Sequence, residues 1–370
     1  MKPQNSSSPK ILVIHATAGA GHRKAAEAIH HGLSARHITT AMIVDALDYT
    51  SAFFRCGYSK GYEFMVAEMP TFWAGFFWLT DQAWFLPFFR AGRRFYNGIN
   101  THRLVSYLRQ EKFDRIVITH FLSAEVCGYL KRTGQIDSRL IVVVTDFDVH
   151  KIWLIEGVDE YCVASEYTRE RLMALGVGAE RITVTGIPLD EKFTRLREKK
   201  EIRRKLGLDA DAFTVLISTS SFGFGPIEQL AEYLEQLQLI VICGNNQALR
   251  QRMEARGNRR HKICGFVDNM EEMMAASDVM VTKPGGLSVT EALANNLPMV
   301  FFSAIPGQEA GNVRVLAANG IGLSGMPLRD LASEVLGLSA SPAALMAARE
   351  KTKRLAKPNS VEDIISRLVL

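Results

Sequence analysis

Short runs rich in valine and isoleucine alternate with amphipathic stretches along the chain, and this alternation constrains the fold more than any other feature. In the first half, six such runs are predicted strands: 11–15, 40–47, 115–120, 140–146, 160–165 and 181–186. Their apolar residues are continuous, as in parallel strands that are covered on both faces. Helical patterns lie between them at 22–35, 122–133 and 166–175. The pattern therefore predicts a doubly wound α/β domain.

The second half repeats this alternation after a basic segment, 195–205, which is expected to be a solvated connecting helix. The predicted strands that follow are 213–219, 239–244, 262–266, 278–283 and 298–303. The predicted helices are 226–236, 246–256, 269–276, 287–296, 308–319 and a helical tail over 342–370. The length of 370 residues also suits two domains. With a boundary near Pro188, we predict two Rossmann-like domains, residues 1–190 and 191–370.

Composition narrows the setting of the chain. Apolar residues make up 47 % and charged residues 22 %, which excludes a mostly disordered or coiled-coil chain. Five cysteines form no CxxC pair, so a disulfide framework or zinc site is not expected, and a reducing cytosol is the simplest compartment. The polar N-terminus lacks the apolar run of a secretory signal. A net charge of +5 favours an anionic partner.

Residues 53–96 do not fit the alternation, because they hold 16 of the chain's 33 aromatic residues. Residues 82–109 add five arginines and no acidic residue. Aromatic and basic residues together are typical of a surface in the headgroup layer of an anionic membrane. We therefore predict a membrane-binding segment over 53–110, and the alternative is an ordinary aromatic core. The predicted membrane contacts are Trp73, Phe76, Phe77, Trp78, Arg90, Arg93 and Arg94.

The first motif with chemical meaning is ATAGAGHRKAAEAI, residues 16–29, directly after the first predicted strand. Its small residues let the backbone approach a ligand closely, and the helix that follows offers free N–H groups. It is not the G-x-G-x-x-G fingerprint of dinucleotide-binding proteins. His22 lies at the junction of loop and helix, where an imidazole can accept a proton from an alcohol. The alternative is a capping or structural histidine.

Two further motifs lie in the second half. In TKPGGLSVTEALANNLP, residues 282–298, the Gly285-Gly286 turn opens a helix whose N-terminus suits an anion. Glu291 lies about one turn into that helix, and its carboxylate can accept from a pair of ribose hydroxyls. In IPGQEAGNVRVL, residues 305–316, polar side chains at a helix start suit a ligand with many hydroxyls, such as a sugar: Gln308, Glu309 and Asn312.

Asp146 and Asp148 form a short Asp-x-Asp sequence that could be taken for a metal site. Such a match is frequent by chance, and no larger carboxylate cluster accompanies it. We therefore expect no cofactor and no obligatory metal.

These motifs resemble the monogalactosyldiacylglycerol synthase and processive diacylglycerol glucosyltransferase family, whose members are GT-B enzymes related to the peptidoglycan lipid II synthase. The similarity extends over residues 10–325 and includes GFVDNMEEMMAASDV (265–279), TDFDVHKIW (145–153) and TGIPLDEKF (185–193). It implies an α/β GT-B fold, with two Rossmann-like domains facing a central cleft.

The resemblance also implies roles for individual residues. His22 would be the base, Glu291 would bind the ribose, and Gln308 and Glu309 would bind the donor sugar. The backbone at Phe266 and Val267 would hold the uracil. Gly21, His150 and Trp153 would lie on the acceptor side. The family's glycine-rich loop appears here as STSSFGFGP, residues 218–226, in which Gly223 and Gly225 remain but serines replace other glycines.

By this resemblance, the protein would transfer galactose or glucose from a UDP-sugar to the 3-hydroxyl of diacylglycerol with inversion. It would act on the cytoplasmic face of the membrane as a peripheral protein, with anionic lipids and no nucleic acid as partners. One alternative is a lipid II synthase-like transfer of GlcNAc to a polyprenyl-linked acceptor. Others are a UDP-sugar epimerase or hydrolase, and a membrane-binding module without activity.

Overall fold

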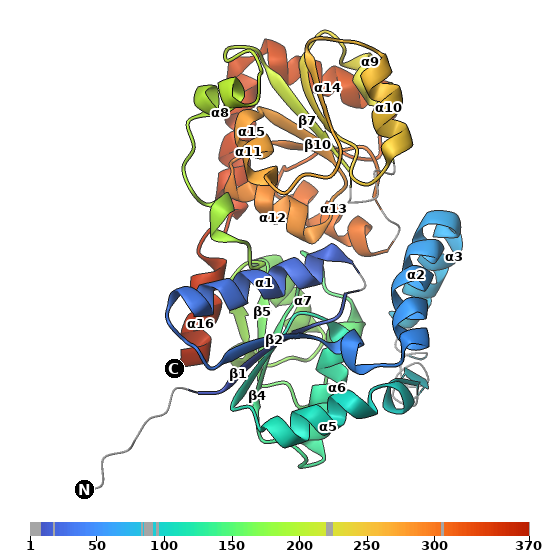
Figure 1. Cartoon of the computed structure of the whole chain (residues 1–370), viewed down its shortest axis with the longest axis vertical. Coiled ribbons are helices and arrows are strands. Elements are labelled where there is room, and N and C mark those ends of the chain that lie inside the picture. Colours follow the sequence, from blue (N-terminus) through green and yellow to red (C-terminus); the bar gives the residue numbers. More distant parts are fainter. Residues whose placement is uncertain are drawn as a thin grey trace, which may run out of the picture. The chain divides into compact units, whose positions relative to one another are not determined.

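The computed structural model describes residues 9–17, 19–82, 84, 92–93, 96–219, 225–304 and 307–369. The chain forms two compact units (Figure 1). The first unit contains the described residues of 1–190, 306–308 and 359–370, and the second contains those of 191–305 and 309–358.

The first unit is built on a parallel sheet of six strands in the order β2-β1-β3-β4-β5-β6. The strands are β1 (Ile11–His15), β2 (Ala41–Asp45), β3 (Arg115–Ile118), β4 (Arg139–Val143), β5 (Glu160–Val163) and β6 (Ile182–Val184). All six strands expected from the sequence are present, each within a few residues of its predicted bounds. The prediction of a doubly wound α/β sheet is confirmed.

Helices cover both faces of this sheet. They are α1 (Ala20–Ala35), α5 (His102–Glu111), α6 (Phe121–Arg132), α7 (Glu166–Ala174) and α16 (Ser360–Val369). Ile11 and Val13 of β1 belong to a core shared with α1 and α16, whereas Leu12 and Ile14 belong to a second core shared with α5 and α6. Successive residues of one strand thus enter different cores, which is why the strands are apolar throughout.

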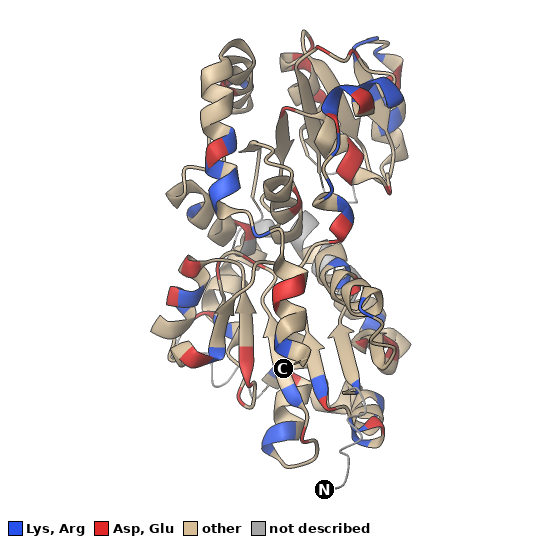
Figure 2. Ribbon diagram, turned by 90° about the vertical axis from the view of Figure 1, so that its left-hand side faces the viewer, with Lys and Arg blue, Asp and Glu red and all other residues tan. Residues whose placement is uncertain are grey.

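The last helix departs from the sequence-based domain assignment. We predicted that residues 191–370 form the second domain, yet α16 packs against α1 of the first unit (Figures 1 and 2). A Cβ on Gly32 of α1 would lie 2.5 Å from the Cγ1 of Val361, so the two helices touch closely at this glycine. Arg367 donates to the buried Glu160 carboxylate at 2.6 Å. The apolar face of α16 thereby covers the sheet of the first unit.

The aromatic segment contains two helices, α2 (Ala52–Glu68) and α3 (Pro70–Thr80), which form the α2–α3 hairpin, residues 52–80. The Ser51 hydroxyl caps α2 by accepting from the Phe54 N–H, and Pro70 opens α3, a position that suits proline. Phe54 is buried in the core of the unit, whereas most of the described apolar side chains further along the hairpin are not. The hairpin is therefore anchored at its base.

The second unit has a parallel sheet in the order β11-β10-β7-β8-β9. Its strands are β7 (Thr214–Ser218), β8 (Gln238–Ile242), β9 (His261–Cys264), β10 (Val279–Thr282) and β11 (Met299–Phe301). Its helices are α8 (Lys199–Lys205), α9 (Ile227–Tyr233), α10 (Gln247–Ala255), α11 (Met270–Ala276), α12 (Gly286–Ala294), α13 (Gln308–Ala318), α14 (Leu328–Ala340) and α15 (Pro342–Leu355).

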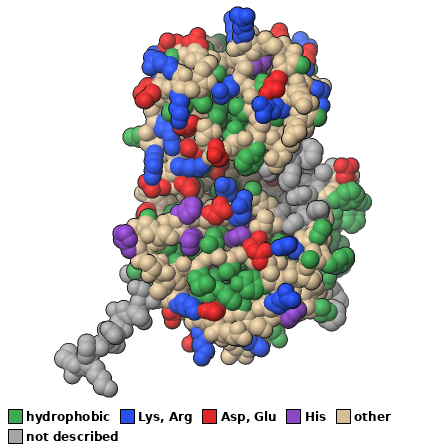
Figure 3. Space-filling view, viewed as in Figure 1, with side chains coloured by type: hydrophobic (Ala, Val, Ile, Leu, Met, Phe, Trp, Pro, Cys, Tyr) green, Lys and Arg blue, Asp and Glu red, His purple; other side chains and the backbone are tan. Residues whose placement is uncertain are grey.

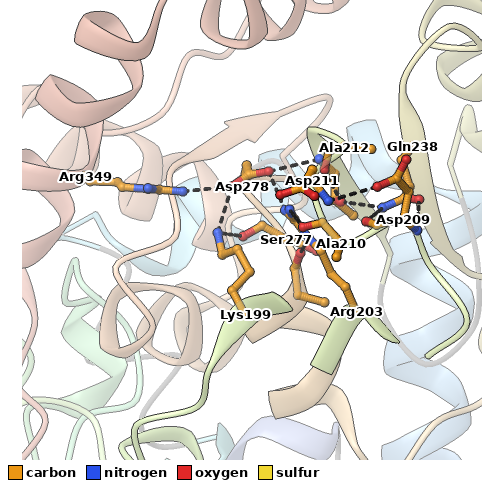
Figure 4. Close-up of polar contacts among 12 residues, drawn as sticks. Lys199, Arg203, Asp209, Ala210, Asp211, Ala212, Gln238, Ser277, Asp278 and Arg349 are labelled. Carbon is orange, nitrogen blue, oxygen red and sulfur yellow. Dashed lines mark hydrogen bonds and ion pairs between the residues drawn. The ribbon is translucent and has the colours of Figure 1, made fainter. Parts of the chain in front are cut away.

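The basic segment is less solvated than we predicted, because α8 is tied to Asp278, the residue directly before β10 (Figure 4). The Asp278 carboxylate accepts from Arg203 at 2.6 Å, Lys199 at 2.7 Å and Arg349 at 2.9 Å. Burial would raise the pKa of Asp278, but Lys199 and Arg203 outweigh it and leave the pKa lowered. A buried carboxylate requires such partners, and this explains why Arg203 is itself buried.

Within the described residues, no single helix is both long and apolar enough to cross a bilayer. Residues 328–340 and 342–369 satisfy that criterion of length and composition only when they are taken together as a bent pair.

Candidate functional site

Each sheet has a point at which the chain reverses its direction of winding. In the first unit, the chain passes from β1 outward to β2 and then returns to β3 on the other side of β1. In the second, it passes from β7 outward to β8 and β9 and then returns to β10. Doubly wound sheets bind ligands beyond the carboxyl ends of the strands at this point. The candidate sites are therefore the ends of β1 and β3 and the ends of β7 and β10.

His22 lies at the first of these points, in the first turn of α1. Its Nδ1 atom is 2.7 Å from the backbone oxygen of Thr119 and 3.0 Å from the hydroxyl of Thr145. The Thr119 hydroxyl donates in return to the His22 backbone oxygen at 2.9 Å. Thr119 follows β3 and Thr145 follows β4, so the ends of neighbouring strands fix the position of this imidazole.

This geometry assigns the protons of His22. A carbonyl oxygen only accepts hydrogen bonds, so Nδ1 carries the proton and donates it to Thr119. Nε2 of the neutral ring then keeps its lone pair. Burial lowers the pKa of His22 to about 4, against the opposing effect of the Thr119 hydrogen bond. The side chain is therefore a neutral acceptor of protons at physiological pH.

Two aromatic side chains lie beside His22. The ring of His120 meets it edge to face with centroids 4.5 Å apart, and Trp153 lies at 6.3 Å. His120 accepts the Leu122 N–H at its own Nδ1, and burial holds its pKa well below the usual value. Both His120 and Trp153 are buried. Trp153, predicted on the acceptor side, thus belongs to the wall around His22.

The turn before His22 leaves space beside it. A Cβ on Gly19 or Gly21 would have no heavy atom within 4 Å beyond its chain neighbours. Gly19 is the N-cap of α1 and supplies no side-chain cap to the first N–H groups. The first turn of α1 therefore has room and donors for a ligand, as the motif predicted.

Sequence reasoning missed several residues of this site. His15 ends β1, and its Nδ1 is 3.9 Å from Asp45, which ends β2. Burial lowers the pKa of His15, while Asp45 opposes that shift. Thr119 and His120 were also missed, although they directly follow β3. The available signal was their shared place at strand ends, because the carboxyl ends of parallel strands meet at one edge of a sheet.

His150, also predicted on the acceptor side, uses both of its ring nitrogens in hydrogen bonds. Its Nδ1 accepts the Ile152 N–H at 3.0 Å, so Nε2 carries the proton and donates to the Phe77 carbonyl at 3.1 Å. The rings of His150 and Phe77 also lie 4.3 Å apart. His150 thus fastens the end of α3 to the rest of the first unit.

In the second unit, the turn before α12 matches the predicted anion site in part. Gly285 is the N-cap of α12 and provides no side-chain cap, so the first N–H groups of α12, beginning at Gly286, are not capped by a side chain. Asn312 is fully buried and donates to the Pro284 carbonyl at 3.0 Å, so it braces the turn and is not exposed to a sugar. The Glu309 carboxylate lies 3.8 Å from where a Gly285 Cβ would be, and Glu291 is half-buried in α12. Gln308 begins α13.

The loop after β7 is only partly described. Gly225 has φ +153°, and a Cβ there would lie 2.8 Å from the Phe302 ring, so this position requires glycine. Gly223 lies outside the described residues. Beyond β9, Phe266 is 64 % exposed and Val267 is half-buried, which leaves a surface at the predicted uracil position.

The predicted membrane residues separate into two groups. Trp78 is 63 % exposed and Phe76 is also exposed, whereas Trp73 and Phe77 are half-buried. Hydrophobic side chains gather on the α2–α3 hairpin, at the right of Figure 3. Arg93, by contrast, has 11 % side-chain exposure and pairs with Glu125 at 2.6 Å, so it neutralises an internal acid rather than facing lipid. Arg90 and Arg94 lie outside the described residues.

Among the residues whose placement is described, no three His, Cys, Asp or Glu side chains are grouped so that they could hold a metal ion. Asp146 of the Asp-x-Asp sequence is buried. The expectation that no metal is required stays a prediction.

Two doubly wound parallel sheets in one chain form the GT-B architecture, and the predicted fold class is confirmed. The MurG structure from Acinetobacter baumannii shares the fold with a TM-score of 0.63 at 15 % identity, covering 97 % of this chain and 98 % of that one. Residues 22–189 match the monogalactosyldiacylglycerol (MGDG) synthase model, and residues 225–365 match the glycosyltransferase family 28 C-terminal domain.

Curated relatives identify the family more closely. A processive diacylglycerol beta-glucosyltransferase of Bacillus subtilis (strain 168) is 28 % identical, over 97 % of this chain and 94 % of its own length. One of the same name from Bacillus cereus (strain B4264) is 30 % identical, over 84 % of this chain and 81 % of its own length. The chain belongs to the diacylglycerol glycosyltransferase family, as its motifs indicated.

Proposed function

We propose that this protein transfers glucose or galactose from a UDP-sugar to the 3-hydroxyl of diacylglycerol, with inversion at the anomeric carbon. The observation that carries the proposal is the neutral His22, held by Thr119 and Thr145 at the switch point of the first sheet. Family membership supplies the substrate class, because the relatives are named for diacylglycerol. Those names favour glucose, whereas the matching family model is named for galactose transfer.

The proposed reaction is one displacement. Nε2 of His22 takes the proton of the lipid hydroxyl while its oxygen attacks the anomeric carbon and the bond to UDP breaks. The product is the glycolipid with the opposite anomeric configuration, and UDP leaves with the electron pair of the broken bond. UDP is a good leaving group, so no protein acid is required. The uncapped N–H groups of α12 stabilise the charge on UDP.

On the donor side, we assign Glu291 to the ribose hydroxyls and Glu309, with Gln308, to the sugar. A carboxylate accepts well from paired hydroxyls. Glu309 lies against the Gly285 turn, next to the proposed phosphate position, which is where the sugar of a UDP-sugar is attached. The backbone at Phe266 and Val267 is the proposed uracil site.

We propose that the α2–α3 hairpin holds the enzyme on the cytoplasmic face of the membrane as a peripheral protein. Its exposed aromatic side chains support this, since such residues favour the interface between water and lipid. Anionic lipids are the expected partners, and no nucleic acid is expected. Because Arg93 is paired internally, the aromatic side chains contribute more of the attraction than we expected from the sequence.

Measuring UDP release separates this function from the alternatives. The purified chain is given UDP-glucose, UDP-galactose or UDP-GlcNAc with vesicles that contain diacylglycerol, a polyprenyl-linked acceptor or neither. The proposal predicts release from a UDP-hexose only with diacylglycerol. Release with the polyprenyl acceptor and UDP-GlcNAc would indicate a lipid II synthase-like enzyme. Equal release without acceptor would indicate a hydrolase, and interconversion of UDP-sugars an epimerase.

A further inference from the structure

Lys283 lies directly beyond the carboxyl end of β10, at the switch point of the second sheet. Its side chain is half-buried, and its backbone oxygen accepts the Gly285 N–H at 2.9 Å, in the turn that leads into α12. Within the described part of the chain, its ammonium has neither an ion pair nor a hydrogen bond.

Other half-buried lysines of this unit contrast with Lys283. Lys199 binds Asp278 at 2.7 Å, Lys192 binds Glu271 at 3.0 Å, and Lys262 donates to the Leu206 carbonyl at 2.8 Å. A partly buried cation normally has such a partner, because removing its charge from water is unfavourable. Among the residues whose placement is described, Lys283 is thus a cation without a counter-charge of its own.

Thr219 is a second group without a partner, at the end of the neighbouring strand. It directly follows β7 and is only 3 % exposed, yet among the described residues its hydroxyl has no hydrogen-bond partner. Val281 of β10 pairs with Ile217 of β7, so continuing this register by two residues brings Lys283 beside Thr219. Gly225 lies close by, since a Cβ there would be 3.2 Å from the Thr219 methyl group.

We propose that the Lys283 ammonium and the Thr219 hydroxyl bind the diphosphate of the UDP-sugar. Both supply donors beside the uncapped N-terminus of α12, and an anion is the ligand that accepts from all three. Lys283 would offset the negative charge that develops on UDP as the glycosidic bond breaks. The nearby Glu309 carboxylate does not suit a phosphate and remains assigned to the sugar hydroxyls. The inference rests on the proposed function and names two residues of its donor site.

Calorimetry with UDP and uridine tests this assignment, because only UDP carries the diphosphate. In Lys283→Met, UDP affinity should fall about 10- to 100-fold while uridine affinity stays unchanged, as expected for losing charge-assisted hydrogen bonds. Thr219→Val should weaken UDP binding about 2- to 10-fold by the same comparison. Lys283→Arg should recover part of the loss. Lys353→Met, an exposed lysine of α15, is the matched control and should bind both ligands as the wild type does.

The inference is overturned if Lys283→Met binds UDP within twofold of the wild type. It is also overturned if UDP and uridine affinities fall equally, since the effect would then not lie at the diphosphate. A wild-type protein that binds neither ligand would defeat the proposed function itself, and the two failures are therefore distinguishable.

Discussion

The Nδ1 atom of His22 lies 2.7 Å from the backbone oxygen of Thr119, a residue 97 positions further along the chain. The contact joins the first turn of α1 to the end of β3, which are neighbours only because the chain reverses its winding between β1 and β3. It places the proton on Nδ1 and leaves the Nε2 lone pair available to accept a proton. The fold thus determines both the position of this side chain and its tautomer.

The first prediction concerns pH. Since burial lowers the pKa of His22 to about 4, its imidazole, the proposed base, stays unprotonated far below the usual histidine range. The acidic limb of kcat/KM should therefore lie nearer pH 4 than pH 6.5, with little loss of activity between pH 8 and 6. The assay uses diacylglycerol vesicles. If kcat/KM falls to half at or above pH 6.5, the burial of this imidazole is contradicted.

The same shift affects stability. His22 has a lower pKa folded than unfolded, so the unfolded chain binds the proton first as the pH falls. The contribution of His22 to the free energy of unfolding is complete above pH 6.5 and is lost as the pH falls toward 4. The free energy of unfolding should decrease by about 2–3 kcal/mol from this residue over that window. In denaturant titrations, His22→Gln should show a smaller decrease.

The second prediction concerns the donor. Glu291→Ala should lower UDP affinity, because two ribose hydroxyls lose a charged acceptor worth about 1.5–3 kcal/mol. Glu232→Ala, an exposed acid of α9, serves as the matched control. Isothermal titration showing equal UDP affinity in wild type and Glu291→Ala would remove Glu291 from the site.

The third prediction concerns metals. The N–H groups at the start of α12, Lys283 and Thr219 are the proposed donors to the diphosphate, so turnover should persist in EDTA. Rates are compared before and after chelation, and after Mg²⁺ or Mn²⁺ is returned. Complete loss that either ion restores would show that the reaction requires a divalent cation.

The fourth prediction concerns the membrane. Replacing Phe72, Phe76 and Trp78 by serine should release the protein from anionic vesicles, because these side chains are exposed on α3. Phe77 is left intact since its ring packs on His150. Binding should fall only partly at high salt, because salt screens charge attraction but not apolar burial.

Flotation with anionic vesicles measures this binding, and UDP titration shows that the variant is folded. Tyr233 and Met346, exposed in the second unit, provide a control variant when both are changed to serine. Flotation of the triple variant at the wild-type level would mean that the hairpin does not bind lipid.

The strands of both sheets could be predicted from the sequence because each is a continuous apolar run, which has few other stable placements. The α16 helix could not be assigned to the correct unit from its place in the sequence, because it follows the second unit but packs on the first. Its apolar residues, such as Ile364 and Leu368, identify a buried face but not which sheet they cover. The central cleft that the resemblance implied stays a prediction.

The candidate site could be predicted where a residue lies within a motif, as His22 and Glu291 do. His120 and Thr219 were missed because their significance comes from neighbours distant in sequence. Asn312 and Arg93 show the converse, because each has a side chain that suits a ligand but binds a partner inside the protein. Asn312 donates to the Pro284 carbonyl, and Arg93 pairs with the Glu125 carboxylate. Residue type alone does not reveal an internal partner.

The most direct test of the account is the mass of the lipid product. Wild type, His22→Ala and His31→Ala are incubated with diacylglycerol vesicles and UDP-glucose or UDP-galactose, and His31, an exposed residue of α1, is the matched control. The account predicts a hexosyl-diacylglycerol from wild type and from His31→Ala. In His22→Ala, the rate should be about 10²- to 10⁴-fold lower while UDP affinity is retained. Absence of any glycosylated diacylglycerol from the wild type, or a His22→Ala rate above about a tenth of wild type, would contradict it.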